Sequence, residues 1–372
     1  MKMEPFALER YFARHEFTAR YLLSSSDCEA LSMVDVLAMA DAETRQLWEE
    51  LTLGYTETAG HPLLREAIAE IYPGIGGGDI LVMAPEEGIF LLMHALLEPG
   101  DHVICTFPGY QSLYAIARAI GCDVTLWKPD EDQGWRFDVQ QLDAMIRDST
   151  RLVVINFPHN PTGYLPGRDD FATLVACVRQ RGIHLLSDEM YRFLEIHHGA
   201  ILPAACEVYE KAVTLCGLSK TFGLPGLRIG WIATQDCEIR WRMSLLRDYT
   251  TICNSAPGEI LALMAVRCRD AIIMRQRARI LRNINVLDEF FSHRASCFTW
   301  QRPRGGSVCF PRVRKPVNTY EFCEQLIAET GIMLVPSRLF GFGDQHVRFG
   351  FGRENLPEVV ARFAEYVDRR LC

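Results

Sequence analysis

The stretch RLVVINFPHNPTGYLP, residues 151–166, decides the fold because a complete strand is followed directly by a turn. Residues 152–155 are all apolar, which is typical of a strand that is buried on both faces of a parallel sheet. The turn presents Asn160 directly before Pro161 and shortly before Gly163. An Asn-Pro pair often marks nothing more than a turn, so the meaning of Asn160 depends on its surroundings.

Similar apolar runs occur on both sides of this stretch, between residues 79 and 234. They alternate with longer segments of helical period, such as residues 138–148 and 169–182, as a parallel sheet covered by helices requires. The six further strands are expected to begin at Asp79, His102, Asp123, Ile183, Ala212 and Leu227. We therefore expect an α/β protein whose large domain has a seven-stranded, mostly parallel sheet between helices.

The C-terminal part of the chain has a different pattern. Residues 258–294 have helical period without a proline, and three short strand candidates follow, namely CFTW, GSVCFPRV and HVRFGFG. Helices are expected around residues 319–329 and 354–370. These patterns predict a large domain over residues 46–257 and a smaller α/β domain formed by residues 1–45 and 258–372.

Composition argues against several classes of function. With 47 acidic and 39 basic residues the net charge is −8, which opposes binding to nucleic acid. Thirteen cysteines without a CxxC pair are typical of reduced thiols, and we expect no metal site. The N-terminus resembles no signal peptide, and no run approaches ~18 apolar residues. We therefore expect a cytoplasmic protein that binds neither nucleic acid nor membrane.

Two polar segments follow predicted strands, at the sheet edge where open parallel sheets bind ligands. In LSKTFGLPGLRIGW, residues 218–231, Lys220 and Arg228 flank a glycine-rich turn whose backbone can approach a phosphate, which the arginine can clamp. Taken alone, both could be solvated surface charges. In LLSDEMYRF, Asp188 and Tyr191 follow an apolar strand, and a carboxylate at that depth needs a partner.

Three motifs occur together in this order: N-F-P-x-N-P-T-G, S-D-E-x-Y and S-K-x-F-G-x-x-G-x-R-x-G. Together they resemble the aminotransferase class I/II family. The resemblance extends to LGYTETAGHPLLREAIAEIY near the start, ALLEPGDHVICTFPGYQSLY in the middle and HVRFGFGR near the end. It implies the fold of the fold-type I pyridoxal-phosphate (PLP) dependent transferases and pyridoxal 5'-phosphate as cofactor.

The resemblance also implies roles for individual residues. Lys220 should bind the cofactor as a Schiff base and then move the proton at the substrate α-carbon. Asp188 should pair with the pyridine nitrogen and keep it protonated. Asn160 and Tyr191 are expected to donate hydrogen bonds to the phenolic oxygen of the cofactor. Lys220, Asp188 and Tyr191 are therefore the expected catalytic residues.

Further residues are implied around the cofactor and the substrate. Tyr110 matches the aromatic residue that stacks on the ring, although it could also be core packing. Arg228 matches the phosphate clamp, and Ser219 is expected beside it. Tyr55 matches a tyrosine that reaches the phosphate from the other subunit, which implies a homodimer with shared sites. Arg348, with Asn160 nearby, is expected to bind the substrate carboxylate, for which a planar guanidinium is suited.

The sequence departs from the family pattern in several places. The phosphate loop is Ala-Pro-Glu-Glu-Gly, residues 84–88, so a proline removes one amide donor. Glu86 and Glu87, counted here among the cofactor-binding residues, could instead cap a helix or meet a basic substrate group. Gly217 replaces a serine of the phosphate cup. Residues 22–32, LLSSSDCEALS, replace a glycine-bearing stretch that many members place over the substrate.

These observations leave three functions to compare. The leading hypothesis is an aminotransferase that acts on an α-amino acid and a 2-oxo acid. The alternative is a PLP-dependent cyclase, oxidase or lyase on a basic amino acid, because residues 248–260 and the runs SSSDCE and APEEG resemble capreomycidine synthase-like cyclases. Asp27, Glu86 and Glu87 could form an acidic lining, or all three could point to solvent. A transcription regulator would need a DNA-binding domain, for which the segment before Tyr55 leaves no room.

Overall fold

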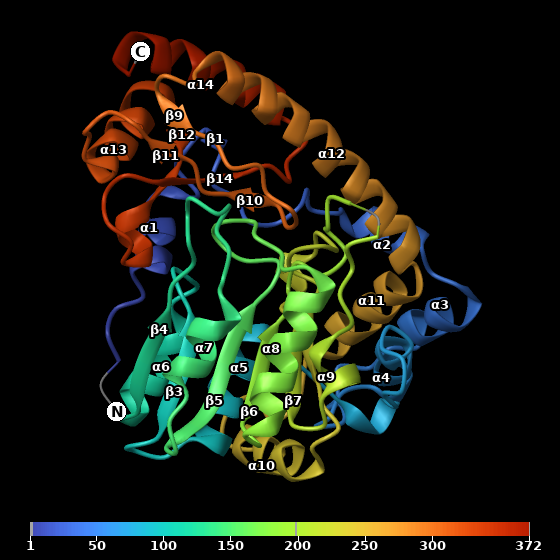
Figure 1. The fold of residues 1–372 in the computed structure, drawn as a ribbon. Coiled ribbons are helices and arrows are strands. Elements are labelled where there is room, and N and C mark those ends of the chain that lie inside the picture. Colours follow the sequence, from blue (N-terminus) through green and yellow to red (C-terminus); the bar gives the residue numbers. More distant parts are fainter. Residues whose placement is uncertain (1–2, 198, 372) are drawn as a thin grey trace.

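The computed structural model describes residues 3–197 and 199–371. Its centre is a sheet of strand order β2-β8-β7-β6-β5-β3-β4, and the C-terminal elements lie beside one end of this sheet (Figure 1). The strands are β2 (Ile80–Met83), β3 (His102–Thr106), β4 (Asp123–Trp127), β5 (Thr150–Asn156), β6 (His184–Asp188), β7 (Ala212–Gly217) and β8 (Gly230–Ala233). Strand β8 runs opposite to the other six strands, which are parallel to one another. The predicted seven-stranded, mostly parallel sheet is confirmed.

Both faces of the sheet are covered, which explains why its strands are continuously apolar. On β5, Val153 and Ile155 belong to one hydrophobic cluster and Leu152 and Val154 to another, as the period of two in a strand requires. The covering helices are α5 (Pro85–Leu96), α6 (Ser112–Ile120), α7 (Val139–Met145), α8 (Arg168–Gln180), α9 (Ala205–Val208) and α10 (Cys237–Arg247).

A third cluster packs helices against the β2 and β8 edge of the sheet. It includes residues of α2 (Met33–Ala38), α4 (Pro62–Ala69) and α11 (Ala256–Arg267). The neighbouring elements are α3 (Ala42–Glu49), η1 (Gly77–Asp79), η2 (Pro225–Leu227) and the long α12 (Arg269–His293). The uninterrupted helical pattern of the sequence is thus divided at Cys268 into α11 and α12.

The smaller group of elements has its own hydrophobic core, built from the C-terminal half of α12 and the strands and helices after it. These elements are β9 (Phe298–Thr299), β10 (Val308–Cys309), β11 (Arg312–Val313), α13 (Thr319–Thr330), β12 (Ile332–Met333), β13 (Val335–Pro336), η3 (Ser337–Phe340), β14 (Val347–Gly350) and α14 (Leu356–Arg370). The run GSVCFPRV forms two strands, and β12 and β13 were not predicted.

The N-terminal segment contributes to both parts. After α1 (Ala7–His15), strand β1 (Tyr21–Leu22) pairs in parallel with β12, whereas Val36 of α2 belongs to the cluster at the edge of the large sheet. The domain boundaries given above therefore stay a prediction. None of the helices in the described ranges is both long and apolar enough to cross a membrane.

Candidate active site

The carboxyl ends of β5 and β6 are tied together by Asn156, the last residue of β5. Its side-chain amide donates to the carbonyl oxygen of Asp188 at 3.0 Å, and its Oδ1 accepts from the backbone N–H of Asn160 at 2.7 Å. These two bonds fix the Asn-Pro turn against the end of β6. Asn160 and Asp188, which are far apart in the sequence, are thereby held close together.

Asp188 is a buried carboxylate at the end of β6, with 7 % of its surface exposed. Its Oδ1 accepts one backbone hydrogen bond, from Met190 at 3.1 Å. Burial raises the pKa of Asp188 to about 6, which this hydrogen bond and the charge of Lys220 only partly oppose. A carboxylate that is desolvated to this degree favours a cationic ligand beside it.

Lys220 lies three residues beyond β7, where its Nζ donates to Ser26 Oγ at 2.8 Å. Burial lowers the pKa of the ammonium group, while the charge of Asp27 acts in the opposite direction. A lysine with a lowered pKa is more often neutral and is therefore a better nucleophile toward a carbonyl group.

Arg348, on β14, is brought to the same place from the other end of the chain. Its side chain is 1 % exposed, and it donates to Asn160 Oδ1 at 3.2 Å and to the carbonyl oxygen of Ser24 at 2.9 Å. Its guanidinium carbon lies 5.8 Å from the ring centre of Phe12 and 5.5 Å from that of Phe340. The Nε atom is buried without a hydrogen-bond partner among the described residues, so its N–H can donate to a ligand.

The glycines of the RFGFG run are explained by a close approach of the N-terminal segment. A Cβ at Gly350 would lie 1.7 Å from the carbonyl oxygen of Ser25, and one at Gly352 would lie 2.3 Å from that of Asp27. Side chains at either position would displace the segment that brings Ser26 to Lys220. The close packing of these two segments therefore builds part of the site.

Tyr110 is half-buried and follows β3, next to α1. Its ring packs against Phe6 with centres 4.8 Å apart, and its hydroxyl donates to Glu9 Oε1 at 2.9 Å. The predicted residues did not include Glu9, because nothing in the sequence near the N-terminus indicates that α1 borders the site.

Two departures from the family pattern are linked by packing. A Cβ at Gly217 would lie 3.1 Å from Pro85 Cγ and 2.9 Å from the Cα of Gly230. The ring of Pro85, at the first turn of α5, therefore fills the space that a serine at position 217 would need. Because these residues are far apart in sequence, only the folded structure connects them.

The two acids that begin α5 have different surroundings. Glu87 accepts hydrogen bonds from the hydroxyls of Thr250 at 2.5 Å and Thr251 at 2.7 Å, which hold it toward the loop after α10. Glu86 is half-buried, and burial raises its pKa to about 7, with smaller effects from Asp188 and other nearby charges. Glu86 and Glu87 therefore have different surroundings, although they are adjacent and chemically identical in the sequence.

The remaining predicted residues differ in exposure. Ser219 is buried, at 6 % exposure, beside Lys220. Arg228 is exposed, has a positive φ of 55°, and donates to the carbonyl oxygen of Pro225 at 2.9 Å. Tyr55 is 91 % exposed, so its side chain is not part of the site formed by its own chain.

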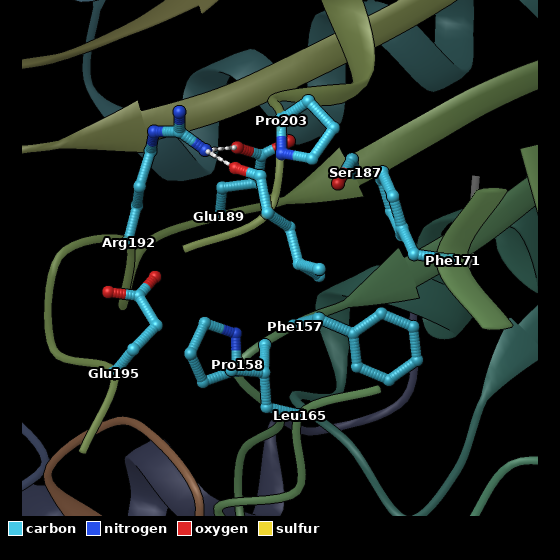
Figure 2. Close-up of a pocket in the computed structure, with 10 residues that line it drawn as sticks. Phe157, Pro158, Leu165, Phe171, Ser187, Glu189, Arg192, Glu195 and Pro203 are labelled. Atoms are coloured by element: carbon cyan, nitrogen blue, oxygen red, sulfur yellow. Dashed lines mark hydrogen bonds and ion pairs between the residues drawn. The ribbon is translucent and has the colours of Figure 1, made fainter. Parts of the chain in front are cut away.

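The turn after Asp188 is supported by a buried charged network. Glu189 accepts from Arg192 at 3.2 Å and from the backbone of Ala205 at 2.9 Å (Figure 2). Glu189, Arg192 and Glu195 line a small pocket together with Phe157 and Pro158. We interpret this network as structural, because it fixes the backbone that carries Asp188 and Tyr191.

The sequence missed three residues that contact or position the predicted ones, namely Ser26, Asn156 and Glu9. A weak signal for Asn156 exists, since it ends an otherwise apolar strand. Ser26 belongs to the run that was noted as unusual, but a serine in a loop gives no indication of its partner.

Comparison with known proteins gives a consistent result. The sequence model described as aminotransferase class I and II matches residues 21–363. Capreomycidine synthase from Streptomyces vinaceus is 31% identical over 363 residues, which cover 96% of this chain and 92% of that protein. A PLP-dependent aminotransferase from Streptococcus suis 89-1591 has a TM-score of 0.93 and 31% identity, with 99% of each chain covered. The PLP-dependent cyclase OrfR has a TM-score of 0.90 and 28% identity, covering 100% of this chain and 98% of that one.

Proposed function

Because the chain belongs to the aminotransferase class I and II family, we propose that it moves an amino group from an α-amino acid to a 2-oxo acid, with the cofactor bound as a Schiff base to Lys220. The observation that supports this proposal is the convergence of three distant segments. Asn156 binds both the carbonyl oxygen of Asp188 and the backbone of Asn160, and Arg348 donates to Asn160 and to Ser24. Lys220 donates to Ser26, two residues beyond Ser24, so the nucleophile, the buried carboxylate and the buried guanidinium lie at one site.

The family and its solved relatives are PLP-dependent, and the residues of this site fit that cofactor. Asp188 is buried and forms no ion pair with a described residue, as expected for a carboxylate that faces a protonated ring nitrogen. The hydroxyl of Tyr191 is buried and has no hydrogen-bond partner among the described residues. When bound, pyridoxal phosphate supplies an electron sink for the negative charge that develops on the substrate α-carbon.

The remaining roles are those that the family resemblance implies. Asn160 and Tyr191 would hold the phenolic oxygen, and Tyr110 would cover the ring. Ser219 and Arg228 would hold the phosphate, with Glu86 among the nearby charges, whereas Glu87 is held by Thr250 and Thr251. Arg348 would bind the α-carboxylate and orient the α-carbon, so that the amine of Lys220 can take up its proton and return it.

A half-reaction experiment tests the proposed function. Amino acids are added one at a time to the purified protein, and the cofactor spectrum is followed for the change from the aldehyde to the amine form. We expect at least one amino acid to cause this change and a 2-oxo acid to reverse it. If no amino acid changes the spectrum, the proposed function is wrong.

A second candidate is a cyclase on a basic amino acid. It is favoured by the likeness to capreomycidine synthase and to the cyclase OrfR, and by the Pro85 and Gly217 departures in the phosphate cup. The same experiment separates the two candidates. A cyclase would consume its substrate catalytically while the cofactor returned to the aldehyde form without any 2-oxo acid.

Replacing Arg348 should weaken substrate binding much more than cofactor binding. Charge-assisted hydrogen bonds contribute ~1.5–3 kcal/mol apiece, so Arg348→Ala should raise the amino-acid concentration for half-conversion at least ~10-fold. The resting spectrum should stay unchanged. Arg348→Lys keeps the charge but loses the planar guanidinium. Its half-conversion concentration should lie between those of the unaltered protein and Arg348→Ala. Arg362→Ala, an exposed arginine of α14, is the control. An unchanged half-conversion concentration in Arg348→Ala would exclude carboxylate binding by this residue.

We also propose a homodimer with shared sites. Tyr55 and Leu53 are 91 % and 84 % exposed, and Tyr249 is 90 % exposed, which is typical of surfaces covered by a partner. The side chain of Tyr55 is available to a second subunit because it contributes nothing to its own site.

Mixing two impaired variants tests the shared site. Lys220→Ala and Tyr55→Phe chains should each be impaired, and their mixture should be more active than their sum, because one site of each hybrid dimer is intact. Tyr249→Phe should behave like the unaltered protein. Full activity of Tyr55→Phe, or an active monomer at low concentration, would contradict the shared site.

A further inference from the structure

Helix α1 lies over the substrate end of the site. Phe12 of this helix covers the Arg348 guanidinium, with 5.8 Å between the guanidinium carbon and the ring centre. Glu9 is three residues before Phe12 and Glu16 is four residues after it, and residues at these spacings share one helix face. Both carboxylates therefore lie one turn away from the side chain that covers Arg348. In Figure 1, α1 lies between the sheet and the C-terminal strands.

The position of Glu9 is fixed by Tyr110, whose hydroxyl donates to Glu9 Oε1 at 2.9 Å. Glu9 is half-buried and forms no ion pair with any residue that the structure describes. Burial lowers the pKa of Lys220 and of Arg348, and the charge of Glu9 is among the nearby charges that oppose this effect at both groups. Tyr110 holds one oxygen of Glu9, and the other oxygen accepts no hydrogen bond from a residue that the structure describes.

Other acids near the site are neutralised or turned away. Asp27 forms an ion pair with Arg353 at 3.0 Å, and Glu87 is held by two threonine hydroxyls. Glu16 is half-buried, and burial raises its pKa, as does repulsion by Asp27 and Glu9. Burial raises the pKa of the half-buried Glu86 to about 7, so this carboxyl group is partly protonated near neutral pH. Among these acids, Glu9 of α1 is therefore the one left to pair with a substrate side chain.

A second, independent observation concerns Arg348, the residue expected to bind the α-carboxylate of the substrate. Arg348 is 1 % exposed, and its Nε is buried without a partner among the described residues. A guanidinium at one end and the free oxygen of Glu9 at the other match a molecule that has a carboxylate at one end and a cation at the other.

We propose that Glu9 is the specificity-determining residue of this site and that it selects α-amino acids with a guanidinium or ammonium side chain. The inference rests on the proposed function, because it names the substrate class of the same site. A neutral side chain would leave the half-buried carboxylate without a partner, and this cost produces the selectivity. Of the acids that the sequence suggests for this role, Asp27 is paired with Arg353 and Glu87 is held by Thr250 and Thr251.

Pairs of amino acids that differ mainly in side-chain charge provide the test. Apparent dissociation constants are measured by spectral titration and calorimetry for arginine against citrulline and for lysine against norleucine. The cofactor-loaded protein should prefer at least one cationic member by at least ~10-fold. In Glu9→Gln this preference should disappear, because the cationic member binds more weakly and the neutral member binds at least as well as before. Glutamine can still accept the Tyr110 hydrogen bond, so the aromatic ring stays in place.

Glu4→Gln is the matched control, because Glu4 lies in the same N-terminal segment but is exposed and only 3.9 Å from an exposed arginine. This variant should keep the full preference. Spectral changes without any preference for charge, or a preference that persists in Glu9→Gln, would overturn the inference and leave the proposed function intact. If neither member of either pair changes the spectrum or binds, the inference fails together with its premise.

Discussion

Replacing Lys220 by alanine is expected to abolish both covalent cofactor attachment and turnover. Borohydride should fix the mass of the cofactor onto Lys220 in the unaltered protein and onto no residue in Lys220→Ala. Turnover should fall by at least ~10⁴-fold, because the variant loses the nucleophile and the group that moves the α-proton, and proton transfer alone contributes up to about this factor. Peptide mapping by mass spectrometry and a turnover assay make the two measurements.

Lys128→Ala is a suitable control, since Lys128 is exposed at the end of β4. It should retain the modified Lys220 peptide and normal turnover. Burial lowers the pKa of the Lys220 ammonium group. Lys220 should therefore form the imine more readily than an exposed lysine, because a neutral amine reacts without first losing a proton. Cofactor mass on another lysine, or on none, would remove the basis of the whole assignment.

The second large effect is expected at Asp188. Asp188→Ala should retain the cofactor but lose turnover by ~10³-fold or more, if the carboxylate stabilises the charge that develops in the reaction as other preorganised groups do. Asp188→Asn keeps the size of the side chain, and its amide oxygen can still accept the hydrogen bond from Met190. The neutral amide cannot, however, keep a ring nitrogen protonated. It should therefore be almost as impaired as the alanine variant.

Asp132→Asn removes an exposed carboxylate in a turn and should leave turnover unchanged. Absorption spectra of all three variants would establish that the cofactor is still bound, and thermal unfolding would establish that the buried substitution has not destroyed the fold. Near-normal turnover of cofactor-loaded Asp188→Asn would count decisively against a pairing of this carboxylate with the ring nitrogen.

Much of the large sheet could be predicted because its strands are buried on both faces. All seven runs of apolar residues correspond to observed strands, and the bounds of β4 coincide with the expected run from Asp123. The smaller part was predicted less completely. Its strands have two residues each apart from β14, so β12 and β13 carry no pattern that a period of two could distinguish from a loop.

The motif residues Asn160, Asp188 and Lys220 were found in sequence because each lies at the end of a strand or shortly after it, at one edge of the sheet. The carboxyl ends of parallel strands lie at the same edge of a sheet, so residues at these ends are expected to share one site. This inference needs no knowledge of side-chain contacts. Arg348 could be placed only by resemblance to the family, since β14 belongs to a different sheet.

By itself, then, the sequence determined the sheet, the family and the residues at the strand ends, because burial and backbone direction are encoded locally by apolar runs and turns. Only the tertiary structure decided which charges face the site. It paired Asp27 with Arg353, turned Glu87 toward two threonines, filled the place of a serine with Pro85, and brought Glu9 to Tyr110. Each of these contacts joins residues far apart in the chain, and the energy of a charge depends on partners that no local pattern records.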